Sequence, residues 1–488
     1  MAEISATTTT TTFADVANAR AKVFKETFKK FASTADVLSP LEGPEGSGAS
    51  IAIRNDIRGR RGDRIEFTAS SELGGFGVLG EAMLKGNEED LKFSGTTCTL
   101  EFKRHATALT SSLKKKMAGG HTLESLAAEV LGNHFGQWKQ RDALRRLIDG
   151  VRGVGTAALD DDVPLPSGGV FGGDAVKLDD LAAADSFGIN SIVDLTTQAA
   201  WLGVEPARIT RNGYPSSQDT YHHCLLADNQ MLRPLLKTSQ FGSTIAQADL
   251  RGATNPLFNG DLKEFDGTKI LNIRGTYGDL NGPIGSPLTP VARLKAVADV
   301  ADDMFLCGAQ SLRNVTNATG GEADRDYFTD FPGHQYKYTE ADTFTHDDNE
   351  YFLKVINPDG TSAIIKYVNS ASGVGTDATK TNDGNHGTHI KVAAVSGSNL
   401  TGGDIADGAL AFPCNDGGQI YGYAILMGAD AVIRAYGEDM RMTDDKDDYD
   451  FRHGIGYQAM YGDAIWKDRN ERVRNYVLGI YAYDPIGA

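Results

Sequence analysis

The sequence predicts an α+β fold, and three observations support this prediction. A long amphipathic pattern from Leu123 to Ile148 indicates a helix. Glycine is abundant, with 56 glycines among 488 residues, which indicates many turns and connections. Helical patterns are mixed among separated strand-like runs, the arrangement that α+β folds show. The strand-like runs lie near Tyr221 to Leu226, Lys269 to Arg274, Ile420 to Met427 and Val473 to Tyr483.

The helix from Leu123 to Ile148 has signals at both ends. Thr122 is a good N-cap, and Gly150 is expected to end the helix. Acidic residues lie early and arginines late, which suits the helix dipole. At 1.5 Å rise per residue the helix spans roughly 39 Å, which is long for a globular protein.

Three further helices are expected. The first runs from about Ala14 to Ser33, where Phe24 and Phe28 belong to an apolar face. Its lysines suit a membrane surface, but docking on a neighbouring molecule is the preferred interpretation. A second helix, Ser191 to Leu202, is followed by Gly203, and Thr289-Pro290 opens a third that runs to about Leu306.

A long hairpin is predicted between residues 49 and 109. Its strand-like runs are Ile51 to Phe67 and Thr97 to His105, and glycine-rich sequence that includes Gly77 and Gly80 separates them. Such a hairpin has few apolar residues of its own, so it needs another surface on which to rest. An arginine stripe near its start either docks on acidic neighbours or protects a solvated strand edge. The stripe comprises Arg54, Arg58, Arg60, Arg61 and Arg64.

A β-rich insertion is expected from residue 321 to 412. Phe352 to Ile356 and Ala363 to Val368 flank the turn sequence Asn357-Pro358-Asp359-Gly360, which predicts a second hairpin. The flanking stretches are rich in Gly, Ser, Asn and Thr.

The net charge of −17 is distributed unevenly along the chain. Residues 1–150 carry 21 Lys and Arg against 19 Asp and Glu, whereas the remainder carries 27 against 46. An acidic body disfavours tight binding to nucleic acid, because affinity for phosphate comes from clustered cations. A basic arm beside an acidic body either makes contacts between copies or is a solvated surface.

No targeting, membrane or disulfide signal is recognised. The chain has no apolar run of 18 residues, and residues 1–12 lack the features of a signal peptide, so a soluble, unsecreted protein is expected. The cysteines have no CxxC spacing, which predicts buried thiols rather than a zinc site or a disulfide framework. They are Cys98, Cys224, Cys307 and Cys414.

The motifs that could carry chemistry fail in context. Residues 75–80 match GxGxxG, but no βαβ unit surrounds them, so a hairpin tip is preferred over a cofactor loop. The histidine pairs at 222–223 and 386–389 lack a third metal ligand. Residues 444–450 are acidic without the pattern of a calcium loop, and a solvated loop is expected there. The sequence therefore predicts no catalytic residue, no cofactor and no metal site.

The order of elements and several local sequences resemble a known family. An N-terminal arm, a long hairpin, a long helix and a mixed body follow one another as in the Hong Kong 97-type fold. Three local sequences and the closing 452–462 block are similar to the major capsid proteins of N-four-like podoviruses, over most of residues 50–320 and 413–488. The local sequences are Arg104-His105-Ala106, Asn255-Pro256-Leu257-Phe258-Asn259-Gly260 and the run from Ile420 to Ala431.

The resemblance implies a domain organisation. It comprises an N-terminal arm (1–50), an extended E-loop hairpin (51–112), a peripheral domain with the spine helix (113–185), an axial and peripheral body (186–320), the β-rich insertion (321–412) and the C-terminal part of the body (413–488). The expected contacts between subunits, drawn from the hairpin and the arm, are Arg58, Arg60, Arg61, Gly77, Gly80, Phe24 and Phe28.

The function that the resemblance implies is structural. Hexamers and pentamers would form an icosahedral virion shell around double-stranded DNA, assembled in the bacterial cytoplasm without membrane contact. A portal protein, a scaffold and decoration proteins are the expected partners. An encapsulin-like compartment shell and an unrecognised α/β enzyme remain as alternatives.

Overall fold

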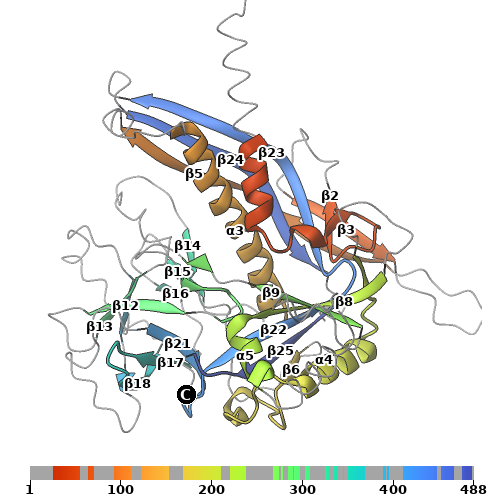
Figure 1. Cartoon of the computed structure of the whole chain (residues 1–488), viewed down its shortest axis with the longest axis vertical. Coiled ribbons are helices and arrows are strands. Elements are labelled where there is room, and N and C mark those ends of the chain that lie inside the picture. Colours follow the sequence, from red (N-terminus) through yellow and green to blue (C-terminus); the bar gives the residue numbers. More distant parts are fainter. Residues whose placement is uncertain are drawn as a thin grey trace, which may run out of the picture.

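The computed structural model describes twenty stretches of the chain. They are residues 26–54, 64–70, 93–110, 123–152, 169–209, 220–237, 267–273, 276–277, 284–289, 291–296, 303–307, 325–328, 335–338, 344–345, 350–368, 388–391, 393–394, 410–447, 452–466 and 475–485. Figure 1 shows a long sheet with two helices beside it at one end of the molecule, and shorter sheets at the other end.

The long sheet has the strand order β1-β2-β23-β24-β5. Its two longest strands, β23 and β24, contain 16 and 14 residues and form an antiparallel pair with β-bulges. Strand β5 extends this pair along the other edge of β24. The bounds are β1 Glu42–Pro44, β2 Ile51–Arg54, β5 Glu101–Thr110, β23 Val432–Asp447 and β24 Arg452–Ile465.

Two helices lie against the long sheet. Helix α3, Leu123–Arg152, has 30 residues and packs on β24 and β5, and a helix at residues 26–35 packs beside it (Figure 1). Their shared core contains Phe28, Phe135 and Tyr457. The short 3-10 helix η1, Ser39–Leu41, leads from the first helix into β1.

A separate hairpin packs on the long sheet. Strands β3, Arg64–Ser70, and β4, Phe93–Thr99, are antiparallel, with Arg64 paired to Thr99. Phe67, Cys98 and Leu100 form a small core with residues of β23 and β24. The predicted hairpin is thereby confirmed over these two strands, and its glycine-rich tip lies outside the described residues.

A second sheet forms the centre of the other end. Its strand order is β6-β25-β22-β8-β7, and β9 pairs with β8. Helices α4, Ile189–Leu202, and α5, Asn229–Lys237, pack on it, and every residue of β22 and of β25 is buried. The other bounds are β6 Gly169–Phe171, η2 Leu178–Asp180, β7 Ala207–Ile209, β8 Thr220–Asp228, β9 Thr268–Ile273, β22 Tyr421–Met427 and β25 Tyr476–Ala482.

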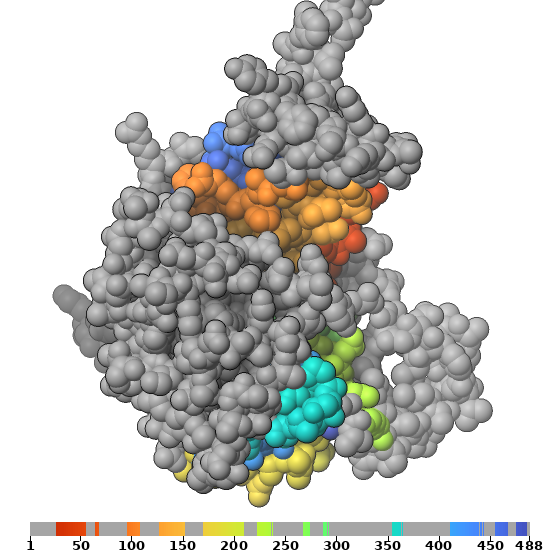
Figure 2. Space-filling view, turned by 90° about the vertical axis from the view of Figure 1, so that its left-hand side faces the viewer, coloured from red at the N-terminus to blue at the C-terminus, as the bar shows by residue number. Residues whose placement is uncertain are grey.

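A seven-stranded sheet with the order β19-β13-β12-β21-β17-β18-β20 adjoins this body. The predicted hairpin is present in it, with β17, Glu350–Ile356, paired to β18, Ser362–Val368, and its turn lies at the surface (cyan in Figure 2). Strands from both sides of residue 321 belong to the sheet. The remaining bounds, with those of two small sheets, are β10 Thr276–Tyr277, β11 Ile284–Gly285, β12 Ala292–Ala296, β13 Asp303–Cys307, β14 Arg325–Phe328, β15 Gln335–Tyr338, β16 Phe344–Thr345, β19 Thr388–Lys391, β20 Ala393–Ala394 and β21 Leu410–Cys414.

Several predicted elements are corrected. The helix expected from Thr289 to Leu306 is wrong, because β12 and β13 occupy that region and pair with each other. The run from Ile51 to Phe67 is not one strand, since β2 and β3 belong to different sheets. The run from Thr97 to His105 is divided at Leu100 between β4 and β5. Asp444 to Asp447 belong to β23 rather than to a loop.

Gly150 does not end the long helix, which continues to Arg152. A Cβ at Gly150 would collide with Ile465 and with the hydroxyl of Tyr476. The glycine therefore allows helix and strands to approach each other closely. Gly203, in contrast, caps α4 at φ +67°, as predicted.

Candidate functional site: a buried charge network beneath the long sheet

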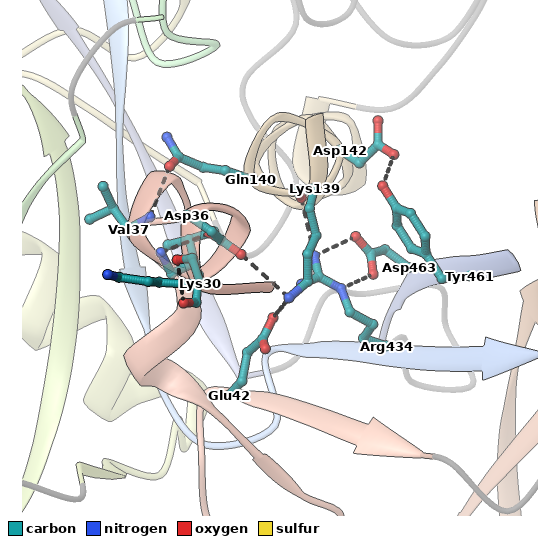
Figure 3. A network of polar contacts seen from close by, with 12 residues as sticks. Lys30, Asp36, Val37, Glu42, Lys139, Gln140, Asp142, Arg434, Tyr461 and Asp463 are labelled. Carbon is teal, nitrogen blue, oxygen red and sulfur yellow. Dashed lines mark hydrogen bonds and ion pairs between the residues drawn. The ribbon is translucent and has the colours of Figure 1, made fainter. Parts of the chain in front are cut away.

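A network of charged side chains lies where α3, the long sheet and the segment at residues 36–42 meet (Figure 3). Its members come from parts of the chain that are several hundred residues apart in sequence. Charges are costly to bury unless they are paired and hydrogen-bonded. The geometry of each pair therefore decides whether the network holds these elements together.

Arg434 of β23 is the centre of the network and is fully buried, at 0% exposure. Its Nε and Nη2 donate to Asp463 Oδ1 and Oδ2 at 2.7 and 2.9 Å, a bidentate pair across β23 and β24. Nη1 donates to Glu42, and Nη2 also donates to the carbonyl of Lys139 at 3.1 Å. Arg434 thus joins both long strands, β1 and α3.

Lys139 and Asp36 extend the network toward the N-terminal helix. The Nζ of Lys139 pairs with Glu42 and lies 3.5 Å from Asp36 Oδ2. Burial raises the pKa of Asp36, while the positive charges of Lys139 and Arg434 act in the opposite direction. The next residue of α3, Gln140, accepts a hydrogen bond from the backbone N–H of Val37 at 3.1 Å.

A second ion pair lies on the same side of the sheet. Lys103 of β5 pairs with Asp142 of α3 at 3.1 Å, and the hydroxyl of Tyr461 donates to the same carboxylate at 2.9 Å. The ammonium of Lys103 lies 5.4 Å from the ring centroid of Trp138. Burial alone would lower the pKa of Lys103, but Asp142 and Glu101 hold it above its ordinary value. The ion pair connects β5 to α3.

Two glycines of α3 set the distance to the helix at residues 26–35. A Cβ at Gly132 would lie 2.8 Å from the carbonyl oxygen of Phe28, and one at Gly136 would collide with that of Ala32. Spaced four residues apart, both glycines lie on one face of α3. The two helices therefore approach each other along this face, which positions Asp36 near Lys139.

Metal ligands and cysteine thiols are the candidate reactive groups within the described residues. Among them, no cluster of three or more His, Cys, Asp or Glu could hold a metal ion. Burial raises the pKa of Cys98 to about 12 and that of Cys224 to about 11, so both thiols are protonated. Within the same residues, no helix has the length and apolar character needed to cross a membrane.

Most of the residues that the sequence predicted as contacts between subunits lie outside the described residues. These are Phe24, Arg58, Arg60, Arg61, Gly77 and Gly80. Phe28 is described, and it is 1% exposed. Its ring packs on Phe135 and Tyr457, with centroids 5.6 and 5.3 Å away. These contacts of Phe28 lie within the subunit.

Sequence reasoning missed the charge network. Arg434 interrupts the apolar sequence Val432-Ile433-Arg434-Ala435-Tyr436. A charged residue within a buried strand requires a buried partner of opposite charge. The position of Arg434 in this apolar sequence could therefore have indicated a buried ion pair. The partners Glu42 and Asp463 have no sequence spacing that could have identified them. His222 and His223 each hydrogen-bond a backbone carbonyl at 3.2 Å.

A solved structure shares this fold. The chain aligns with a subunit of the cyanophage Pam1 capsid at a TM-score of 0.53 and 12% identity, covering 92% of this chain and 93% of that one. The capsid protein of Ralstonia phage GP4 aligns at 0.49 and 16% identity, covering 92% and 91%. The Pam1 alignment defines the class of the fold, which is that of a phage capsid subunit. The predicted Hong Kong 97-like fold is confirmed.

Sequence comparison then gives the family. The family model described as phage capsid protein matches residues 7–325, more than half of the chain. The chain belongs to the phage capsid protein family. The major capsid protein of Pseudomonas phage KPP25 is 23% identical over an alignment of 345 positions that covers 65% of this chain and 87% of that protein.

Family membership establishes a structural role. Copies of the chain form the capsid shell of a phage particle and are part of the virion. The protein is therefore not an enzyme, as the sequence predicted. Membership also favours this role over the encapsulin-like compartment. A shell subunit contacts many neighbours and must keep its shape. The charge network connects the long sheet to α3 through the hydrogen bonds of Arg434.

Proposed function

We propose that the protein assembles as hexamers and pentamers into an icosahedral shell that encloses the double-stranded DNA genome of a tailed phage related to the N-four-like podoviruses. The observation that carries this proposal is the braced long sheet. Strands β23 and β24 are long, and buried ion pairs fix them to α3 and to residues 36–42. Rigid elements of this kind allow identical copies to meet at reproducible angles.

The glycine-tipped hairpin is proposed to reach a neighbouring subunit. Arg58, Arg60 and Arg61 would face acidic groups of that neighbour, and the glycines at 77 and 80 would permit close approach of the backbone. Phe24 belongs to the N-terminal arm and would pack on a neighbouring subunit. The acidic remainder of the chain, with 46 Asp and Glu against 27 Lys and Arg, supports enclosure of DNA without tight binding.

Further partners follow from the same proposal. One vertex of a tailed-phage shell would hold a portal protein, a scaffold would guide assembly in the bacterial cytoplasm, and decoration proteins would attach outside. The domain organisation from the sequence, with an arm at 1–50, a hairpin at 51–112 and an insertion at 321–412, belongs to this proposal. The insertion would be the contact for a neighbour or a decoration protein.

Cryo-electron microscopy of purified assemblies tests the proposed symmetry. We expect closed shells in which rings of six subunits are combined with rings of five. Tubes or flat sheets built from one ring type, both without and with the neighbouring phage proteins, would contradict the icosahedral arrangement.

A variant set tests the hairpin contact. Replacing Arg58, Arg60 and Arg61 by Gln should prevent or slow assembly, whereas Lys at the same positions should restore it, because the contact depends on charge. The substitutions Gly77→Trp and Gly80→Trp should impair assembly while circular dichroism of the isolated subunit stays unchanged. Loss of folding in these glycine variants would contradict a contact between subunits.

A further inference from the structure

Helix α4 covers the second sheet with one face only. Ile192, Leu195 and Ala199 are buried at 0 to 1% exposure and pack with residues of β22 and β25. Gly203 ends the helix in a left-handed conformation. The inner face thus follows the ordinary pattern of a surface helix, with apolar residues spaced three and four apart.

Two large apolar side chains lie on the outer face of α4. Val193, Thr197 and Trp201 follow each other at intervals of four residues and therefore lie on one side of the helix. Val193 is 41% exposed and Trp201 84% exposed. The hydroxyls of Thr196 and Thr197 both donate to the carbonyl of Val193, at 2.9 and 2.7 Å, so they are satisfied within the helix. We call Val193, Thr197 and Trp201 the outer stripe.

The composition of α4 limits what could cover the outer stripe. Asp194 is the single charged residue among the 14 residues of the helix, and it has no Lys or Arg. Nucleic acids and anionic membranes attract cationic surfaces, so neither fits this helix. An exposed tryptophan among uncharged residues is instead typical of the anchor of a protein interface.

We propose that the outer stripe is a contact between subunits in which Trp201 inserts into the surface of a second copy of this chain. The inference rests on the shell function, because a shell surrounds each subunit with identical copies. In Figure 1, α4 lies at the opposite end of the molecule from the far ends of β23 and β24. The contact therefore lies away from the far ends of β23 and β24, and it joins copies at a second place.

Tryptophan fluorescence tests this contact directly. The chain has three tryptophans, Trp138, Trp201 and Trp466, so the difference between the wild type and Trp201→Phe isolates the signal of Trp201. In unassembled subunits this signal should have the emission maximum and acrylamide quenching of a solvent-exposed indole. In assembled shells it should move to shorter wavelength, and quenching should fall severalfold.

Assembly of Trp201→Ala provides the second readout. The critical concentration for assembly should rise at least tenfold, while the denaturation midpoint of the isolated subunit stays unchanged because Trp201 makes few contacts within it. Val176→Ala is the matched control, since Val176 is an exposed apolar residue, at 64%, outside the stripe. This control should assemble like the wild type.

Even if the wild type forms shells, four results would overturn the inference. Trp201 could remain accessible to acrylamide in the shell, it could already be shielded in the isolated subunit, or it could become shielded only when a different phage protein is added. Normal assembly of Trp201→Ala would also contradict it. A wild type that never assembles would instead overturn the shell function. The proposed contact of Trp201 with a second copy would then be overturned as well.

Discussion

Arg434 and Asp463 face each other across β23 and β24 and form a bidentate ion pair with donor to acceptor distances of 2.7 and 2.9 Å. Their side chains are 0% and 2% exposed. A pair at this depth stabilises only if both charges are fully satisfied. Glu42 and the carbonyl of Lys139 complete the hydrogen bonding of the guanidinium, so the pair also fixes β1 and α3.

Removing the guanidinium should therefore be costly. Arg434→Met leaves Asp463 and Glu42 buried without this cation, and we expect the free energy of unfolding to fall by about 3–5 kcal/mol. Urea denaturation of the isolated subunit measures it. The control is Arg441→Met, because Arg441 and its partner Glu438 are 59% and 37% exposed, and this change should cost about 0.5 kcal/mol or less. Equal losses would mean that the network does not brace the sheet.

Gly136→Val should separate the two helices beside the sheet. A side chain here would collide with the carbonyl of Ala32, and overpacking of this kind costs about 1–3 kcal/mol. The cleavage rate of residues 26–38 in limited proteolysis should rise together with this loss. Gln137→Val places the same β-branched residue one position away at a half-exposed site and serves as the control. If both variants are cleaved at the same rate, the glycine face does not hold the helices together.

Acidification should weaken the joint between α3 and β5 through His134. Its ring stacks on His105 at 4.2 Å and faces Trp138, the hydroxyl of Tyr457 and the charge of Arg141. Burial lowers the pKa of His134 from 6.5 to about 4, and the charge of Arg141 and that of His105 in its protonated form act in the same direction. Between pH 6.5 and about 4, His134 is therefore protonated in the unfolded chain but not in the folded chain. Stability is complete above pH 6.5, is lost as the pH falls, and levels off near pH 4.

The size of this pH effect can be measured against a variant. The linkage for His134 is on the order of 2–3 kcal/mol. His134→Phe keeps an aromatic ring beside His105 but removes the titration, so its stability should depend less on pH between 6.5 and 4. Denaturation midpoints of both proteins over this range give the comparison. Parallel curves would exclude His134 as the source of the pH dependence.

The buried cysteines should resist modification in the native subunit. Because Cys98 and Cys224 are 0% exposed and their pKa values are raised to about 12 and about 11, neither forms a thiolate at pH 8. Labelling with a maleimide followed by peptide mass spectrometry should detect both only after denaturation. Fast labelling of either one in the native protein would contradict the burial.

The sequence predicted elements with strong local signals and missed those that depend on distant partners. The periodicity from Leu123 and the cap at Gly203 depend on neighbouring residues, and both elements are present. The Thr289-Pro290 signal failed because β12 gains strand partners in β13 and β21, and these contacts outweigh a local helix start.

The charge network could not have been predicted for the same reason. Glu42 and Arg434 are 392 positions apart, and nothing in their local sequences relates one to the other. Gly150 shows a related ambiguity, since a glycine near a helix end can be a cap or a close-packing site. A side chain at Gly150 would collide with Ile465 and Tyr476, so this glycine is a close-packing site.

Electron microscopy of the purified recombinant protein, combined with sedimentation, tests the central claim that copies of this chain build a shell. We predict capsomers or closed polyhedral shells for the protein alone or together with the neighbouring phage proteins. A small oligomer of fixed size under both conditions would contradict the shell function.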